Sequence, residues 1–159
     1  MKYLFIAFAL LFSACSILPQ PPTQSKLFTM KSKFMKFSDV CYVSSDSFST
    51  TLEIYNAGQA VDRIKIGSHI CNNDGCMSKA AFNKMFFSSS YPETILENII
   101  QGKPIFSALH VKKNSNGFTQ NIYKLHEYDI EYIVQNDEIY FKDKINNILI
   151  KLKDYSNEQ

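Results

Sequence analysis

The residues best suited to chemistry in this 159-residue chain are four cysteines and three histidines. His69, Cys71 and Cys76 stand closest together and place three possible metal ligands within one short stretch. A structural zinc site usually takes four ligands, and the two cysteines of a pair are separated by two to four residues. The remaining histidines, His110 and His126, are isolated in the sequence. We therefore predict that the chain holds no metal and no other cofactor.

Nucleophilic catalysis would require one of these cysteines, or a serine, beside a histidine base. The sequence contains no Gly-x-Ser-x-Gly turn and no Cys-Gly-x-Cys segment, which mark two common classes of hydrolase. The spacing of Cys71 and Cys76 is too long for the Cys-x-x-Cys motif of redox enzymes. The serine-rich stretches at 44–49 and 88–90 are better explained as loops. We predict no catalytic residue and no enzyme activity, with a hydrolase as the least favoured alternative.

The start of the chain carries the features of an export leader. Lys2 precedes an uninterrupted apolar run, Tyr3–Phe12, and Ser13 and Ala14 are small residues of the kind found at a signal-peptidase site. The apolar run is too short to span a bilayer as a helix. On these features alone, an ordinary secreted protein cleaved near Ala14 would keep Cys15 as a plain thiol.

The small-small-Cys ending of this leader resembles the lipobox of bacterial lipoproteins. The resemblance implies that Cys15 is diacylated, becomes the mature N-terminus and receives a third acyl chain. Phe12 departs from the pattern, which prefers leucine there. In these families an aspartate after the cysteine retains the protein in the inner membrane, so Ser16 implies the outer membrane, with the domain facing the periplasm. Two or three acyl chains bind a bilayer stably, and the membrane is therefore the first expected partner.

Three further stretches, Cys71–Phe106, Ile139–Lys142 and Ile148–Lys151, look like parts of small lipoproteins of unknown function from Gram-negative bacteria. That resemblance supplies no catalytic residue. The formal net charge of +2 at pH 7 gives no electrostatic footprint for nucleic acid. We expect a protein partner in the cell envelope, of unknown identity, and no nucleic acid.

An exported chain enters an oxidising compartment, in which disulfides persist. Cys71 and Cys76 enclose the sequence Asn-Asn-Asp-Gly, a strong turn signal, and a hairpin around this turn would bring their sulfurs together. We predict a Cys71–Cys76 disulfide. Cys41 lies in the apolar run Val40–Val43 and is expected to be a buried free thiol. Pairing of Cys41 with Cys71 or Cys76 is the alternative.

The composition and the positions of the prolines divide the chain into four parts. We expect a leader at 1–14, a lipidated cysteine with a Pro-rich tether at 15–25, one domain at 26–155 and a polar tail at 156–159. Pro19, Pro21 and Pro22 favour an extended backbone and exclude a central strand. The 13 phenylalanines and nine tyrosines, with only five glycines and five prolines, suit a compact β-rich domain.

The apolar pattern of the domain predicts strands, then two short helices, then strands again. Helical spacing predicts Ser78–Phe87, with Ser78 as the N-cap, and Pro92–Gln101, which Gly102 ends. Alternation predicts strands over 28–43 (one long or two short), 48–55, 60–70, 105–112, 118–125, 128–134, 138–142 and 148–153. The fold class that follows is α+β, a curled antiparallel sheet of about six to eight strands with two short helices inserted mid-chain.

Apolar side chains are abundant on the two predicted helices, where they most often form core. In a sheet that curls without closing, Phe82, Phe86 and Ile99 would line a groove for an acyl chain or an apolar peptide. Two non-enzymatic functions remain: an accessory, protein-binding lipoprotein of the periplasm, or a carrier of a lipid or other apolar ligand. The first should show an exposed apolar patch or a free strand edge, which we expect in the C-terminal strands, and the second an enclosed apolar cavity.

Overall fold

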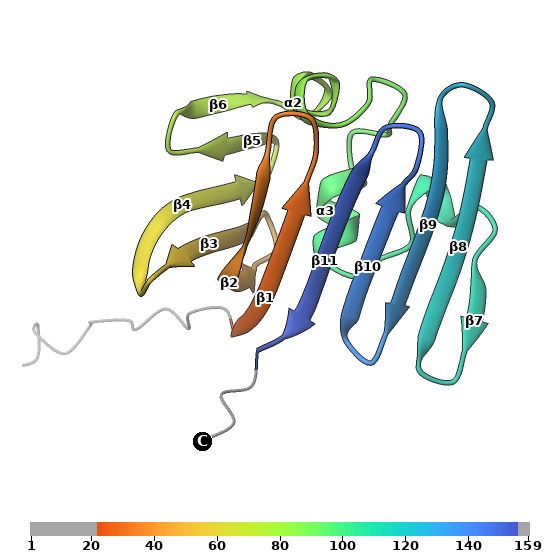
Figure 1. The fold of residues 1–159 in the computed structure, drawn as a ribbon. Helices are drawn as coiled ribbons and strands as arrows, with labels where there is room; N and C mark the ends of the chain where they lie inside the picture. The colour runs from red at the N-terminus through yellow and green to blue at the C-terminus, as the bar shows by residue number, and fades with distance from the viewer. Residues whose placement is uncertain (1–21, 156–159) are drawn as a thin grey trace, which may run out of the picture.

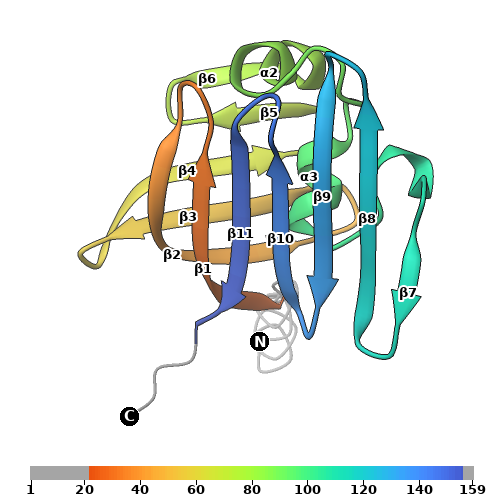
Figure 2. The same ribbon diagram turned by 45° about the vertical axis from the view of Figure 1, so that its right-hand side comes forward.

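A computed structural model of the chain describes residues 22–155. The predicted leader, Cys15 and the tail at 156–159 lie outside these residues. Within them, eleven antiparallel strands form one sheet in the order β6-β5-β4-β3-β2-β1-β11-β10-β9-β8-β7. The sheet curls, and its two edge strands, β6 and β7, do not pair with each other (Figure 1 and Figure 2).

The N-terminal meander runs outward from the middle of the sheet, each strand pairing with the next one in the chain. The last four strands of this meander cross the direction of β1, so the sheet turns a corner at β2 (Figure 2). The bounds are β1 (Thr23–Lys31), β2 (Lys36–Ser45), β3 (Thr50–Asn56), β4 (Gln59–Ile66), β5 (His69–Asn72) and β6 (Gly75–Ser78).

The C-terminal meander starts at the opposite edge and returns to the middle. Its turn at Asn136 and Asp137 lies between the predicted strands 128–134 and 138–142 and has φ of 49° and 61°, which these two residue types tolerate better than most. The bounds are β7 (Lys112–Asn114), β8 (Gly117–Lys124), β9 (Tyr128–Gln135), β10 (Glu138–Asp143) and β11 (Ile148–Asp154).

The first and last strands join the two meanders, because β1 pairs with β11 from Lys26↔Asp154 to Lys31↔Leu149. The Lys26 ammonium, which is buried, forms an ion pair with Asp154 and also donates to the Asp137 carbonyl at 3.3 Å. The described parts of the two chain ends therefore lie side by side at one end of the molecule (Figure 1).

A connector between the two edges carries the helices α2 (Lys79–Phe86) and α3 (Ile95–Ile100) and the 3-10 turn η2 (Phe106–Ala108). Ser78 caps α2 as predicted, since its hydroxyl accepts the Ala81 N–H at 3.2 Å. Gly102, with φ of 62°, ends α3, and the following N–H of Lys103 bonds to the Asn98 carbonyl at 2.8 Å. This pairing is a Schellman cap, which leaves the helix end satisfied.

The core lies on the concave side of the sheet, where α3 fills the space between the meanders (Figure 2). Strand β9 shows the expected alternation, with Tyr128, Ile130 and Tyr132 buried against the connector. All four apolar residues of α3 are buried as well. Burial of such a side chain contributes about 1.5–3 kcal/mol, so the helix and both meanders stabilise one another.

The structure corrects the predicted fold class. The sheet has eleven strands rather than six to eight, and the domain is mostly β, since the two helices cover only 79–86 and 95–100. Three stretches supply the extra strands. The stretch 28–43 folds as two strands, which was one of its two predicted alternatives, 60–70 spans parts of β4 and β5 around a turn, and the predicted Cys71–Cys76 hairpin supplies β6. An apolar run interrupted by a tight turn resembles a single long strand in an alternation pattern.

Two predicted elements are wrong in extent. The stretch 105–112 alternates like a strand but folds as η2 and a loop, and only its last residue, Lys112, begins β7. The predicted helix at Pro92 starts three residues later, because the Pro92 carbonyl accepts the Asn83 Nδ2–H and the Ile95 N–H in a separate turn.

Phe48 was expected to begin the strand at 48–55 and is instead 90% exposed in the turn before β3. The Asp46 carboxylate accepts the backbone N–H groups of Phe48 and Ser49, each at 2.7 Å, and this turn places Phe48 outside β3. A local side-chain hydrogen bond thus outcompetes the strand pattern at this position.

Candidate functional site

The structure bears out the predicted disulfide. Cys71 and Cys76 face each other across β5 and β6 and are bonded to each other. Cys41 is a buried free thiol, and burial raises its pKa to about 12. Because the thiolate is the reactive form, the folded protein holds Cys41 inert.

No metal site is found among residues 22–155, where no group of three His, Cys, Asp or Glu side chains is placed to hold an ion. The sulfur of Cys71 is taken up by the disulfide, and His69 Nδ1 lies 3.3 Å from the Ser68 hydroxyl. His69, Cys71 and Cys76, which lie close together in the sequence, therefore make other contacts in the structure.

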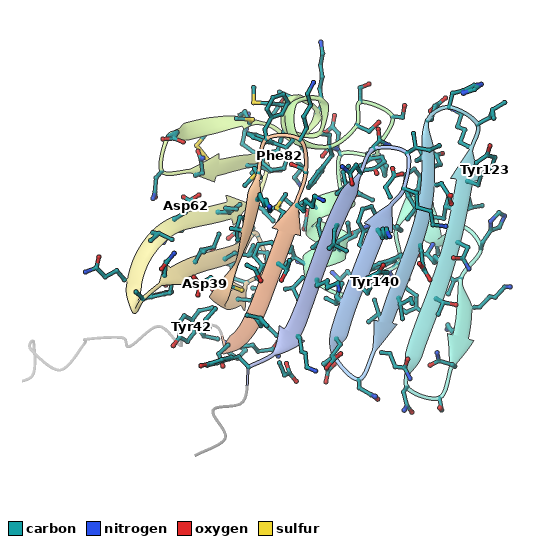
Figure 3. The ribbon with its side chains drawn as sticks, viewed as in Figure 1. Asp39, Tyr42, Asp62, Phe82, Tyr123 and Tyr140 are labelled. Atoms are coloured by element: carbon teal, nitrogen blue, oxygen red, sulfur yellow. A yellow bond between two sulfur atoms is a disulfide. The ribbon has the colours of Figure 1, made fainter. Side chains whose placement is uncertain are left out.

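The three residues predicted to line an apolar groove are not brought together. Phe82 and Phe86 line a hollow of about 250 Å³ between α2, the β1–β2 turn and strands β4–β6. Asp62 lies on β4 at its margin, and Figure 3 shows Phe82 behind the β1–β2 turn. Ile99 is fully buried beneath the sheet and does not reach this hollow.

The most elaborate cluster of polar side chains is a structural clasp around Asp143. This carboxylate is fully buried and accepts the backbone N–H groups of Asp129, Ile145 and Asn146 at 3.1, 2.9 and 3.2 Å. The Asn146 amide at 2.6 Å and the Tyr91 hydroxyl also donate to it. Burial and the hydrogen bond to Asp143 raise the pKa of Tyr91, so its proton stays in place. A carboxylate that is this fully occupied fastens the β10–β11 turn and is closed to a substrate.

At the outer edge of the C-terminal meander, strand pairing is incomplete. Strand β7 pairs with β8 only from Gly117 to Thr119, while β9 pairs with β8 along its whole length. The remaining segment, Gln120–Lys124, has a strand on one side only, and we call it the β8 edge. Tyr123, near the outer margin of the sheet in Figure 3, is 64% exposed on this segment.

A hollow of about 370 Å³ lies where β7 diverges from the β8 edge, lined by His110, Val111, Lys112 and Asn121. Lys112 and its neighbour Lys113 are exposed, and within residues 22–155 no carboxylate lies within 4.0 Å of either ammonium. The hollow therefore has a positively charged side.

The loop that bounds this hollow has an unusual backbone. Phe106, Ser107, Ala108 and His110 all have φ between 48° and 63°, a region that costs an L-residue about 1–2 kcal/mol. The side chain of Gln120 holds the loop in place through hydrogen bonds to Ile105 and Leu109. A group of left-handed residues that persists in one loop is typical of functional sites, where surrounding contacts enforce it.

Gln120 is buried in β8 and clamps both ends of the loop. Its amide oxygen accepts the Ile105 N–H at 2.9 Å, and its amide nitrogen donates to the carbonyls of Ile105 and Leu109 at 3.0 and 2.6 Å. The loop is thereby pulled inward, away from the line that β7 would follow. Gln120 thus creates the gap beside the β8 edge.

The backbone direction of the β8 edge follows from one contact. His110 Nδ1 lies 3.3 Å from the Asn121 carbonyl, so this carbonyl points outward from the sheet. Backbone groups of every second residue point to the same side of a strand. The N–H and C=O of Tyr123 therefore also face the open side of the sheet.

Sequence reasoning placed a free strand edge in the C-terminal strands but missed Gln120 and His110, which shape it. The strand-like alternation of 105–112 hid the loop, and only the uncharged Gln120, which shares one face of its strand with the apolar Phe118 and Ile122, could have suggested a buried clamp. No helix within the described part of the chain is long and apolar enough to cross a membrane. Compared with known proteins, the chain matches no family model and no curated protein.

Proposed function

We propose that this chain is a lipid-anchored protein of the cell envelope that binds another envelope protein by strand addition at the β8 edge. The proposed role is non-enzymatic. The observation that carries it is the open segment Gln120–Lys124, whose outward backbone groups lie beside a preformed hollow. In strand addition, main-chain hydrogen bonds supply affinity, and pockets for alternate side chains supply specificity.

The chemistry of the margin indicates the segment that would bind. An added strand would bond to the Asn121 N–H and to the backbone of Tyr123, since the Asn121 carbonyl already contacts His110, and would lay a side chain on the exposed Tyr123 ring. Lys112 and Lys113 would favour an extended segment that carries acidic residues. Short edge strands and nearby lysines also keep a sheet edge from pairing with itself, so the same charges favour a specific partner over aggregation.

The anchor in this proposal is supported by the leader, the small residues before Cys15 and the proline-rich stretch that follows it. We expect the outer membrane, with the domain in the periplasm. A Cys15→Ser variant should move from the membrane fraction to the soluble periplasmic fraction. Continued attachment of that variant to membranes would contradict lipidation at Cys15.

The binding role is tested with a photo-crosslinking amino acid placed at Tyr123 in intact cells. We expect one adduct of defined mass from this position and none from Phe48, which is more exposed but lies at the β2–β3 turn. A second pair uses the crosslinker at Leu125. Tyr123→Pro, which removes the outward N–H, should abolish that adduct, and Tyr123→Ala should keep part of it. Equal adducts from positions 123 and 48, or insensitivity to Tyr123→Pro, would rule out strand addition.

The alternative, a carrier of an apolar ligand, rests on the hollow that Phe82 and Phe86 line. Its volume of about 250 Å³ lies below the ~300–1,000 Å³ of ordinary ligand pockets. Native mass spectrometry of protein purified from its own envelope distinguishes the two. A bound mass that a Phe86→Glu variant loses would favour the carrier.

A further inference from the structure

Several segments form the end of the molecule opposite the start of β1, and three of them are the β1–β2 turn, α2 and the β10–β11 turn (Figure 1 and Figure 2). Each of them exposes one large apolar side chain, which is 61% exposed for Phe34, 52% for Met85 and 44% for Ile145. Each of these residues directly follows a lysine in the sequence. We call this the apical surface, defined by Phe34, Met85 and Ile145 with Lys31, Lys33 and Lys36.

The β1–β2 turn carries an electrostatic conflict that the described residues leave unresolved. Lys31 and Lys36 are direct cross-strand partners, and like charges in this position repel each other. Lys33 lies between them, with its ammonium 5.1 Å from the centre of the Phe34 ring. Within residues 22–155 no carboxylate lies within 4.0 Å of these three lysines or of Lys84 on α2. A bound anionic surface would relieve this repulsion.

The arrangement of charge and apolar side chains distinguishes between possible occupants. The centres of protein interfaces are depleted in lysine and present a contiguous apolar patch. Here the apolar side chains lie on separate segments, each directly after a lysine. Lys144, before Ile145, forms an ion pair with Asp129 at 3.5 Å, whereas Lys33 and Lys84 have no such partner among the described residues. Aromatic and aliphatic side chains set among lysines are typical of surfaces that lie in the headgroup region of a bilayer.

We propose that the apical surface binds the surface of a bilayer that contains anionic phospholipids. The lysines lie against the phosphates, and Phe34, Met85 and Ile145 enter the headgroup region. This proposal is independent of the β8 edge, which contributes none of these residues. Strand β1 carries the chain from Thr23 to this surface over nine residues, a distance of about 26 Å. A protein anchored before Thr23 therefore has a lipid-binding surface at its far end.

The test uses residues 16–159 without a lipid anchor, because residues 22–155 contain one continuous core. The protein is sedimented with vesicles of phosphatidylcholine alone and with vesicles containing one quarter phosphatidylglycerol. We expect binding only to the anionic vesicles, weakened at about 0.5 M salt, where charges are screened beyond a few ångströms. Lys33→Gln with Lys36→Gln should lower the association constant about 25-fold, at about fivefold for each lysine. Phe34→Ser should lower it about tenfold.

Two matched controls keep the charge and the aromatic count equal. Lys112→Gln with Lys113→Gln removes the same charge from β7, and Phe48→Ser removes a more exposed ring from another turn. Both should leave vesicle binding within about twofold of the parent. The proposal is overturned if the parent does not bind anionic vesicles, if it binds neutral vesicles equally, or if the controls lose as much binding as the apical variants.

Discussion

The two meanders are alike in strand pairing but differ in how each is tied to the connector. The C-terminal meander is joined to it by side chains that are buried or partly buried: Tyr91 bonds to Asp143, Gln120 to Ile105 and Leu109, and the Tyr132 hydroxyl to the Lys103 carbonyl at 3.0 Å. On the N-terminal side, the strands before Ser78 are reached by one such bond, from the Gln101 amide to the Thr50 hydroxyl at 2.6 Å.

The outer edges of the two meanders also differ in how they are held. The β5–β6 edge of the N-terminal meander is closed by a covalent bond between Cys71 and Cys76. The β7–β8 edge of the C-terminal meander is held by three residue pairs and leaves the β8 edge open. The C-terminal meander thus combines buried hydrogen bonds to the connector with an open strand edge. This combination would let it use the β8 edge for the proposed binding while its own strands stay in place.

The largest expected effect is on the clasp. Asp143→Ala takes the acceptor away from the buried Tyr91 hydroxyl and from three backbone N–H groups whose hydrogen bonds are partly buried, so we expect a loss of about 3–5 kcal/mol in the free energy of unfolding. Urea unfolding measures this loss. Asp143→Asn keeps an acceptor and should lose less. A loss below about 1 kcal/mol for the alanine variant would show that the meanders do not differ as described.

A second variant tests whether the 105–111 loop is held separately from the strands. Gln120→Leu removes three hydrogen bonds to the 105–111 loop, and we expect a loss of about 2–3 kcal/mol. Hydrogen exchange should quicken at 105–111, while amides of β1–β4 keep their protection. Uniform quickening across both meanders would mean that the loop is not separately held.

The disulfide should matter less and more locally. In Cys71→Ser with Cys76→Ser, loss of the short covalent loop is expected to cost about 2 kcal/mol. Exchange should quicken in β5 and β6 alone. If β8 and β9 quicken as well, the two edges are coupled through the connector.

An element could be predicted from the sequence when the contacts that determine it join residues close together in the chain. The helix end at Gly102 and the Cys71–Cys76 hairpin were predicted because each is set by a few neighbouring residues. The 105–112 loop was not, because it is decided by the Gln120 clamp, which belongs to another strand. The β8 edge depends on that same contact between distant residues. The alternation pattern therefore indicated a free edge somewhere in the C-terminal strands but could not indicate which strand carries it.

The smallest expected effect is at the exposed turn of the N-terminal meander. Backbone hydrogen bonds from Phe48 and Ser49 hold the pKa of Asp46 below its usual value. A lowered pKa in the folded state adds stability at neutral pH, which is lost as the pH falls through that lowered value, below about 3.9. Asp46→Asn should flatten this part of the acid-unfolding curve. An unchanged curve would contradict the assignment.

The pairing of β1 with β11 also fixes the order in which the chain can finish folding. One side of β1 pairs only with β11, so in a chain that emerges from a ribosome or a translocation pore the two meanders cannot join until the chain is free up to Asp154. Contacts of such long range slow folding, because the loop must close before they form. A product truncated before Ile148 would lack β11, so β1 would pair with β2 alone and its other side would stay exposed to proteolysis in the middle of the sheet.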